Sequence, residues 1–283
     1  MIRTLPNSPL YKIGYRIYVA IFYIFLVMPL ITISVLAFND SNFIGLPWEG
    51  FTLDWFFADT NERKGLFADE ELLLSIWTSI KTGFFVATIS TVVGTLAAFL
   101  FEEEKFRLKG LLYFLALAPL VIPGVILGIS ILLTSTSVGV FIEDTFGIYI
   151  EAFSPGFWLV VLGQFSFCTT YVMLLVSARL RKFDKTLEEA ALSLKATRLE
   201  SIWLITIPFL RPAIIGGFIV AFLISFSNFN TTIFLIGSDP TLPVELYSRI
   251  KFNSTPVLNA VSFLIIVFTT IVAVITIFLN RKK

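Results

Sequence analysis

Residues 186–212 read TLEEAALSLKATRLESIWLITIPFLRP and join two long apolar segments of the chain. Thr186, followed three residues later by Glu189, matches the S/T-x-x-E capping box and predicts the start of a helix. Small and apolar side chains then recur at the i, i+3, i+4 and i+7 spacing of one helical face. They are Leu187, Ala190, Ala191 and Leu194. The segment therefore predicts a short helix that presents a small-residue face between two apolar segments.

A second amphipathic turn, residues 199–207, follows this helix and is expected to end before Pro208. Two interpretations of the small-residue face are open at this point. Alanines allow a partner to approach closely, so the helix could dock in a partner's groove while Glu188 and Glu189 pair with basic residues there. Alternatively, the loop packs on itself along the bilayer surface.

Outside this loop, the chain contains six segments that are long enough to span a membrane, which takes about 20 mostly apolar residues. They lie at roughly 15–38, 78–101, 109–134, 156–179, 212–236 and 257–279. Of the 283 residues, 57% are hydrophobic and 14% are charged, against about 25% charged in soluble domains. We therefore expect an all-α, polytopic integral membrane protein with six transmembrane helices, a tail at residues 1–14 and one transmembrane domain over residues 15–283.

The basic residues indicate the orientation of these spans. Sixteen of the 21 lysines and arginines fall at the two termini, between spans two and three, and between spans four and five. Because cytoplasmic loops of membrane proteins are enriched in lysine and arginine, both termini and the loop that contains Glu189 are expected to be cytoplasmic.

Composition also excludes several kinds of chemistry. The chain has no histidine, which removes His-based triads and imidazole proton relays. Its one cysteine, Cys168, cannot form an internal disulfide or a thiolate cluster. No phosphate-binding glycine motif is present, and a net charge of +1 gives no basis for binding nucleic acid. We expect no catalytic residue, no metal, no bound cofactor and no nucleic-acid partner for this chain.

The first outer loop, residues 39–77, is long and acidic and holds Trp48, Trp55 and Trp77. These side chains could be interfacial anchors, part of a packed lid, or part of a docking surface.

Polar side chains inside a span usually face a pathway or another helix. The candidates for lining a translocation pathway are Ser227, Asn228, Asn230, Thr231, Gln164 and Tyr171. In span three, Pro119, Pro123 and Gly124 predict a kink or break that frees backbone carbonyls to face a cavity. No acidic residue lies within the six spans.

The order Glu189-Ala190-Ala191, then Ala196, then Ile207-Pro208 resembles the cytoplasmic "EAA" loop of ABC-importer permeases. This resemblance implies a MetI-like ABC permease fold in which the loop 184–212 forms a coupling helix against an ATP-hydrolysing subunit. The residues implied in coupling are Glu188, Glu189, Ala190, Ala191, Leu194, Lys195, Ala196 and Pro208. Lys195 stands where the family has glycine, and lysine disfavours positive φ by about 1 kcal/mol. We therefore expect ordinary helical dihedrals at this bend or a straighter connection.

Further segments resemble the second permease of spermidine/putrescine importers: residues 38–41, 48–52 with Trp55, 171–181 leading into 183–184, 242–248 and 259–260. The resemblance implies a bacterial-type inner-membrane subunit that works in the lipid bilayer. Its implied partners are ATPase subunits that use ATP and magnesium, a second permease in a heterodimer, and an extracytoplasmic solute-binding protein.

The cargo is less closely defined than the class. Polyamine permeases tend to have acidic residues where this chain reads Ser227-Asn228, and a polyvalent cation benefits from carboxylate partners. Polyamines are the favoured cargo, and another small amine, a zwitterion or an ion is the alternative. An ion-coupled carrier is a further hypothesis, although such carriers need titratable groups at membrane depth.

Overall fold

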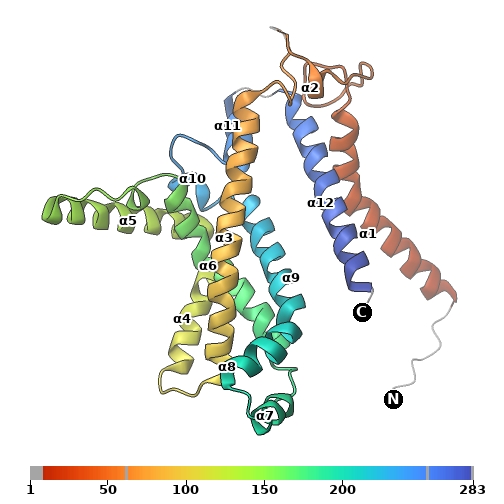
Figure 1. Cartoon of the computed structure of the whole chain (residues 1–283). Helices are drawn as coiled ribbons and strands as arrows, with labels where there is room; N and C mark the ends of the chain where they lie inside the picture. The colour runs from red at the N-terminus through yellow and green to blue at the C-terminus, as the bar shows by residue number, and fades with distance from the viewer. Residues whose placement is uncertain (1–8, 61–62, 253–254, 282–283) are drawn as a thin grey trace. The chain divides into compact units, whose positions relative to one another are not determined.

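The computed structural model describes residues 9–60, 63–252 and 255–281, which are mainly helical (Figure 1). Within them, β pairing is limited to two isolated bridges, so the all-α prediction is confirmed for this part of the chain. Five helices are long and apolar enough to cross a membrane. They are α1 (Pro9–Leu36), α3 (Glu70–Glu103), α5 (Gly124–Phe146), α6 (Phe157–Leu180) and a continuous helix from Arg198 to Phe226.

Two further apolar helices are α4 (Lys109–Val121) and the segment Val257–Ile271 of α12 (Val257–Arg281). The count of six spans therefore stays a prediction. The expected tail at residues 1–14 lies partly outside the described residues, and α1 already begins at Pro9.

The chain divides into two compact units. Unit 1 contains the residues up to Leu73 and those from Ser248 onward. Within it, α1 packs on α12, and Phe38 at the end of α1 lies 5.1 Å, between ring centroids, from Phe263 on α12. Phe56 on the short helix α2 (Asp54–Phe57) joins the same aromatic cluster.

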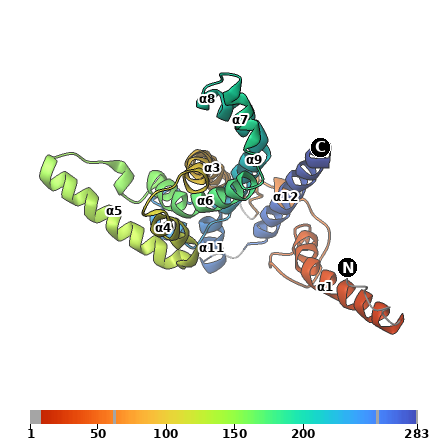
Figure 2. The ribbon, with the colours of Figure 1, turned by 90° about the horizontal axis from the view of Figure 1, so that it is seen from below.

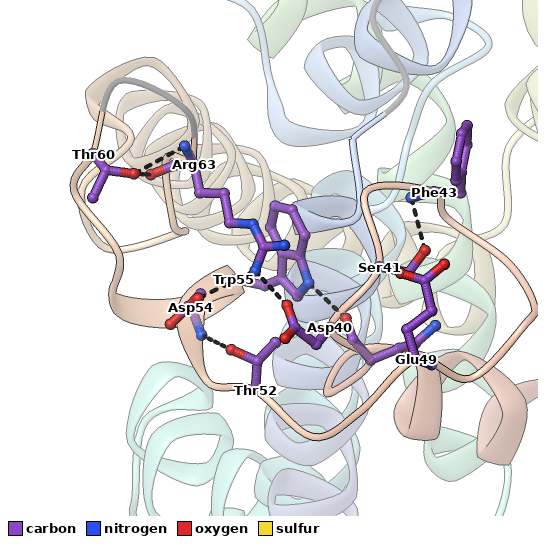
Figure 3. A network of polar contacts seen from close by, with 10 residues as sticks. Asp40, Ser41, Phe43, Glu49, Thr52, Asp54, Trp55, Thr60 and Arg63 are labelled. Carbon is purple, nitrogen blue, oxygen red and sulfur yellow. Dashed lines mark hydrogen bonds and ion pairs between the residues drawn. The ribbon is translucent and has the colours of Figure 1, made fainter.

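The loop between α1 and α3 in unit 1 is folded around Trp55 (Figure 3). The Trp55 side chain is buried, and its Nε1 donates a hydrogen bond of 2.8 Å to the Asn39 carbonyl. The Arg63 guanidinium lies 5.1 Å from the Trp55 ring centroid and pairs with Asp40 and Asp54. Of the three interpretations of these tryptophans, namely interfacial anchor, packed lid and docking surface, the packed lid therefore fits Trp55.

Trp48 and Trp77 are exposed, so anchoring or docking stays a prediction for these two side chains. Trp77 lies within α3 and outside the loop in which the sequence analysis placed it.

Unit 2, Leu74–Tyr247, is built around α6, whose side chains are the most buried of the long helices. This helix packs against α4, α5, α9 (Ile207–Phe226) and α10 (Thr232–Leu235). Figures 1 and 2 both show it inside the group of helices. Close approach depends on glycine: a Cβ at Gly94 of α3 would lie 2.8 Å from the Thr169 carbonyl of α6. Small residues of this kind are the usual means by which membrane helices pack closely.

The helix that follows the loop around Glu189 runs through Pro208, so the expected stop before this proline is wrong. Helix α8 (Arg198–Ser201), a π-helical turn (Ile202–Thr206) and α9 are continuous. In the π turn the Ile207 N–H donates to the Ile202 carbonyl, five residues earlier. This wider turn accommodates the proline, which has no N–H and whose ring crowds the carbonyl four residues earlier.

The expected span 212–236 is also wrong at its far end, because α9 stops at Phe226 and α10 begins at Thr232. The Asn228 Oδ1 accepts hydrogen bonds from the Thr231 and Thr232 N–H groups and from the Thr232 hydroxyl. Side-chain acceptors of this kind compete with the helical pattern and start a new helix instead. Another helix that the sequence analysis did not anticipate, α11 (Leu242–Phe252), follows α10.

The structure contains the break that Pro119, Pro123 and Gly124 predict in the third span. Helix α4 ends at Val121, Ile122 and Pro123 are extended, and α5 begins at Gly124. Helix α5 then continues to Phe146, twelve residues past the expected end, and so includes Glu143 and Asp144 in its last turn. Gly147 ends it in the left-handed conformation, with φ +67°.

Candidate functional site

The predicted loop helix exists as α7 (Thr186–Ser193), but Thr186 does not cap it. The cap position belongs to Lys185, which makes no side-chain capping bond. One residue earlier, the Asp184 Oδ1 accepts from the Thr186 N–H at 3.0 Å and from the Thr186 hydroxyl at 2.8 Å. These two hydrogen bonds hold the pKa of Asp184 below its ordinary value. The aspartate therefore satisfies the N–H of the first residue of α7 through a local side-chain bond.

A complete capping box does occur, one helix later. The Thr197 hydroxyl accepts from the Glu200 N–H at 3.2 Å, and the Glu200 carboxylate accepts from the Thr197 N–H at 2.7 Å. The two bonds fix the start of α8. The Thr197 N–H and the Thr197 hydroxyl, which also donates to the carboxylate at 2.8 Å, lower the pKa of Glu200.

Lys195 has φ +70° and is the one non-glycine residue with positive φ in the described part of the chain. Both expectations for this position, ordinary helical dihedrals and a straighter connection, are wrong. The Ala196 N–H donates to the Ala191 carbonyl, and the Lys195 N–H donates to the Leu192 carbonyl, which is the Schellman pattern. The two hydrogen bonds outweigh the cost of about 1 kcal/mol for a side chain in this region.

The neighbouring glutamates of α7 face different surroundings. Glu188 is partly buried, and its carboxylate accepts a short hydrogen bond from the Thr206 hydroxyl in the π turn. Glu189 and Ala190 are exposed, and Leu194 has 85% of its surface exposed. One side of α7 therefore contacts α8 and the π turn, while another side presents the glutamate, alanine and leucine to the outside.

The remaining residues of the expected coupling set are less exposed or lie farther along the chain. Ala191 and Ala196 are partly buried, and Pro208 is exposed on α9.

A cavity of about 150 Å³ lies where α4 breaks and α9 ends. Four of the six expected pathway residues line it, namely Tyr171, Asn228, Asn230 and Thr231. Facing them are Pro119, Leu120, Ile122 and Gly124 of the α4–α5 break, with Leu127 and Phe167. The Thr231 hydroxyl donates to the Gly124 carbonyl at 3.2 Å and connects the two interrupted segments.

The other two expected pathway residues do not line this cavity. Gln164 is fully buried, donates to the Thr232 hydroxyl at 2.7 Å and accepts a short hydrogen bond from Ser225. It therefore connects α6 with α9 and α10. Ser227 donates to the Leu223 carbonyl one turn earlier, at 2.8 Å.

Sequence reasoning missed the acidic residues at the end of α3, Glu102 and Glu103 with Glu104 directly after them, and their contacts with the segment around α7. Three glutamates in succession at a helix C-terminus are an electrostatic anomaly that could have drawn attention to them, because that end of a helix favours basic residues.

Apolar helices of spanning length, two interrupted helices around a polar cavity and a structured loop helix define the class of a multi-pass membrane transport protein. The family described as "Binding-protein-dependent transport system inner membrane component" matches residues 90–283, and the chain belongs to this family. It is therefore a permease component of an ABC transport system, in a family of inner-membrane components.

Relatives resemble the chain over almost its whole length. The "Putrescine transport system permease protein PotI" of Escherichia coli (strain K12) is 31% identical over 279 residues, covering 98% of this chain and 94% of the relative. The "Spermidine/putrescine transport system permease protein PotC" of Haemophilus influenzae is 29% identical over 92% of this chain and 94% of the relative. A crystal structure of a bacterial ABC transporter for alginate import contains a chain of the same fold, with a TM-score of 0.69, 16% identity and 98% coverage of both chains.

Proposed function

We propose that this chain is the transmembrane permease subunit of an ATP-driven importer and that its cargo is a polyamine. The similarity to putrescine and spermidine/putrescine permeases over more than nine tenths of the chain carries this proposal. In it, a solute-binding protein delivers the cargo, a second permease completes the pathway, and the partner ATPase uses ATP and magnesium. This chain itself binds no cofactor and catalyses no reaction.

Carbonyl oxygens and aromatic rings support a cationic cargo in the absence of carboxylates. No acidic residue lines the cavity in the described part of the chain. Helices α4 and α9 end at the cavity while α5 begins at it, so the partial charges of these helix ends oppose one another. Pro123 has no N–H, so the Pro119 carbonyl receives no bond from the residue four positions later. Carbonyl oxygens and the faces of Phe167 and Tyr171 are groups that attract an ammonium ion.

The size of the cavity supports a thin cargo. Its volume of about 150 Å³ is below the roughly 300–1,000 Å³ of common ligand pockets. An unbranched diamine suits this space better than a sugar ring does.

The loop from Asp184 to Pro212 is proposed as the contact with the ATPase. Its exposed side presents Glu189 and Ala190, and a carboxylate beside small residues suits a partner groove with basic walls. Helix α8 and α9 run without interruption from this loop to the cavity, so a displacement of α7 reaches the end of α9 directly.

Uptake into proteoliposomes tests the class and the cargo together. The complete complex, assembled from this chain, the second permease, the ATPase and the binding protein encoded beside it, is expected to accumulate labelled putrescine only with ATP on the ATPase side. Excess spermidine should compete, and excess ornithine, a zwitterion, should not. Uptake driven by an ion gradient without the ATPase would reject the importer, and competition by ornithine alone would reject the polyamine.

A further inference from the structure

Three glutamates stand in succession where α3 ends beside the α7 loop: Glu102 and Glu103 are its last two residues, and Glu104 follows it directly. This arrangement is unfavourable by itself, because the carboxylates repel one another and the C-terminal end of a helix already has a partial negative charge. Successive residues on a helix also point in different directions. The three side chains therefore need separate partners.

Each glutamate has its own basic partner. Arg181, directly after α6, donates from Nη2 and Nε to the Glu102 Oε1 at 2.8 and 3.0 Å. Lys185, directly before α7, lies 2.7 Å from the Glu103 Oε2. Arg198, the first residue of α8, lies 3.1 Å from the Glu104 Oε1.

The three ion pairs enclose α7 along the chain, because two basic partners precede the helix and one follows it. Two of the carboxylates are more buried than their partners: the Glu102 and Glu103 side chains are 16% and 21% exposed, against 61% and 60% for Arg181 and Lys185, whereas Glu104 and Arg198 are both exposed. Hydrogen bonds to these glutamates raise the pKa of Arg181 and of Lys185, so both partners keep their charge.

An apolar groove of about 690 Å³ lies behind these pairs, between α3 and the continuous α8–α9 helix. Leu96, Phe99 and Leu100 of α3 line one wall, and Leu199 and Trp203 line the other. Glu103, Glu104, Glu188 and Arg198 also line this groove. The groove separates α3 from the continuous α8–α9 helix. The three ion pairs supply direct contacts between α3 and the segment that contains α7.

We propose that Glu102, Glu103 and Glu104 are positioning residues that connect α3 to the coupling loop, so that a displacement of α7 moves α3 together with α9. This proposal rests on the proposed function, in which the partner ATPase moves α7. An exposed ion pair contributes only about 0.2–1 kcal/mol, so one pair is easily broken. The three pairs lie on both sides of α7 along the chain. Together they resist a displacement of α7 relative to α3.

A purely structural role is the competing explanation, since the basic residues also neutralise the end of α3. That role predicts losses in assembly and thermal stability. The positioning role predicts that assembly and basal ATP hydrolysis persist, while the cargo transported per ATP hydrolysed falls.

The test uses the complete reconstituted complex with Glu103→Lys, Lys185→Glu and the double exchange Glu103→Lys/Lys185→Glu. Each single variant is expected to transport about two- to fivefold less putrescine per ATP, with normal copurification of the ATPase. The double exchange should recover transport to within about twofold of the unmodified complex, because the pair is restored with opposite polarity. If Glu103→Lys does not assemble, Glu103→Gln removes the charge without changing the shape and should show the same loss.

Lys182→Glu is the matched control, because it removes the same charge from the same loop at a position with no ion pair among the described residues. It should leave the ratio of transport to hydrolysis unchanged. The proposal is overturned if the double exchange is no better than either single variant, or if Lys182→Glu loses as much as Lys185→Glu. Failure of the unmodified complex to transport with ATP would instead reject the proposed function.

Discussion

Lys195 shows how one residue can keep a backbone geometry that its side chain disfavours. Its φ of +70° closes the Schellman pattern at the end of α7. Lys195→Gly should stabilise this turn by about 1 kcal/mol, and Lys195→Val should destabilise it, because a β-branched side chain is least tolerant of positive φ. Hydrogen exchange of the Ala196 amide, bonded to the Ala191 carbonyl, should slow by about fivefold in the glycine variant. Equal exchange in both variants would contradict this explanation.

Asn228 combines a structural acceptor with a place on the cavity wall. Asn228→Asp keeps the acceptor for the Thr231 and Thr232 amides and adds a negative charge beside the cavity. We expect this variant to take up putrescine with a lower half-saturation concentration, because the carboxylate attracts the diamine. Asn228→Ala removes the acceptor and should reduce uptake. An aspartate variant that is as impaired as the alanine variant would place the cargo route elsewhere.

At the scale of elements, unit 1 contains an ion pair with a defined pH response. Asp69 precedes α3, accepts from the Leu72 N–H at 3.1 Å and pairs with Arg249 of α11. Burial raises the pKa of Asp69, but the hydrogen bonds from Arg249 and Leu72 and the positive charges of Arg249 and Lys64 outweigh it and hold that pKa below its ordinary value. The pair therefore stabilises the fold above the unfolded pKa of about 3.9, and this stability is lost as the pH falls through the lower folded pKa.

Asp69→Asn should accordingly cost about 1–3 kcal/mol at pH 7. The difference in thermal unfolding between the detergent-purified unmodified chain and the variant should shrink once the pH falls below about 4. A difference that is constant from pH 7 to pH 3 would show that the charge of Asp69 contributes nothing.

The elements also show which parts of the structure the sequence can predict. Hydrophobic length and helix formers located the long helices and α7, and prolines located the break between α4 and α5. The ends of the helices were harder to predict, because they depend on competition between local hydrogen bonds. Asp184, and not Thr186, accepts the side-chain hydrogen bond at the start of α7, Asn228 ended α9 early, and a π turn carried the helix through Pro208. The contacts of Glu102 to Glu104 join residues 79 to 94 positions apart, which local patterns do not contain.

For the whole molecule, the distribution of basic residues predicts that the α7 loop is cytoplasmic and the loop around Trp55 is outside. Cysteine labelling tests this orientation, because Cys168 is the one native cysteine and is buried, whereas Asn42 and Ser193 are exposed. In a Cys168→Ala background, a membrane-impermeant maleimide should label Asn42→Cys on intact cells, and Ser193→Cys only after lysis. The reverse pattern would contradict the proposed direction of transport.

The central claim is that α7 transmits the action of a partner ATPase to the cavity. The most direct measurement compares cargo-stimulated ATP hydrolysis and putrescine uptake for the unmodified complex and for the double variant Glu189→Lys/Ala191→Trp. Both positions lie on α7, where Glu189 is exposed and Ala191 is partly buried. We expect the variant to lose binding of the ATPase, or to retain binding and lose both stimulation and uptake. Full stimulation and full uptake in the variant would contradict the coupling role of this loop.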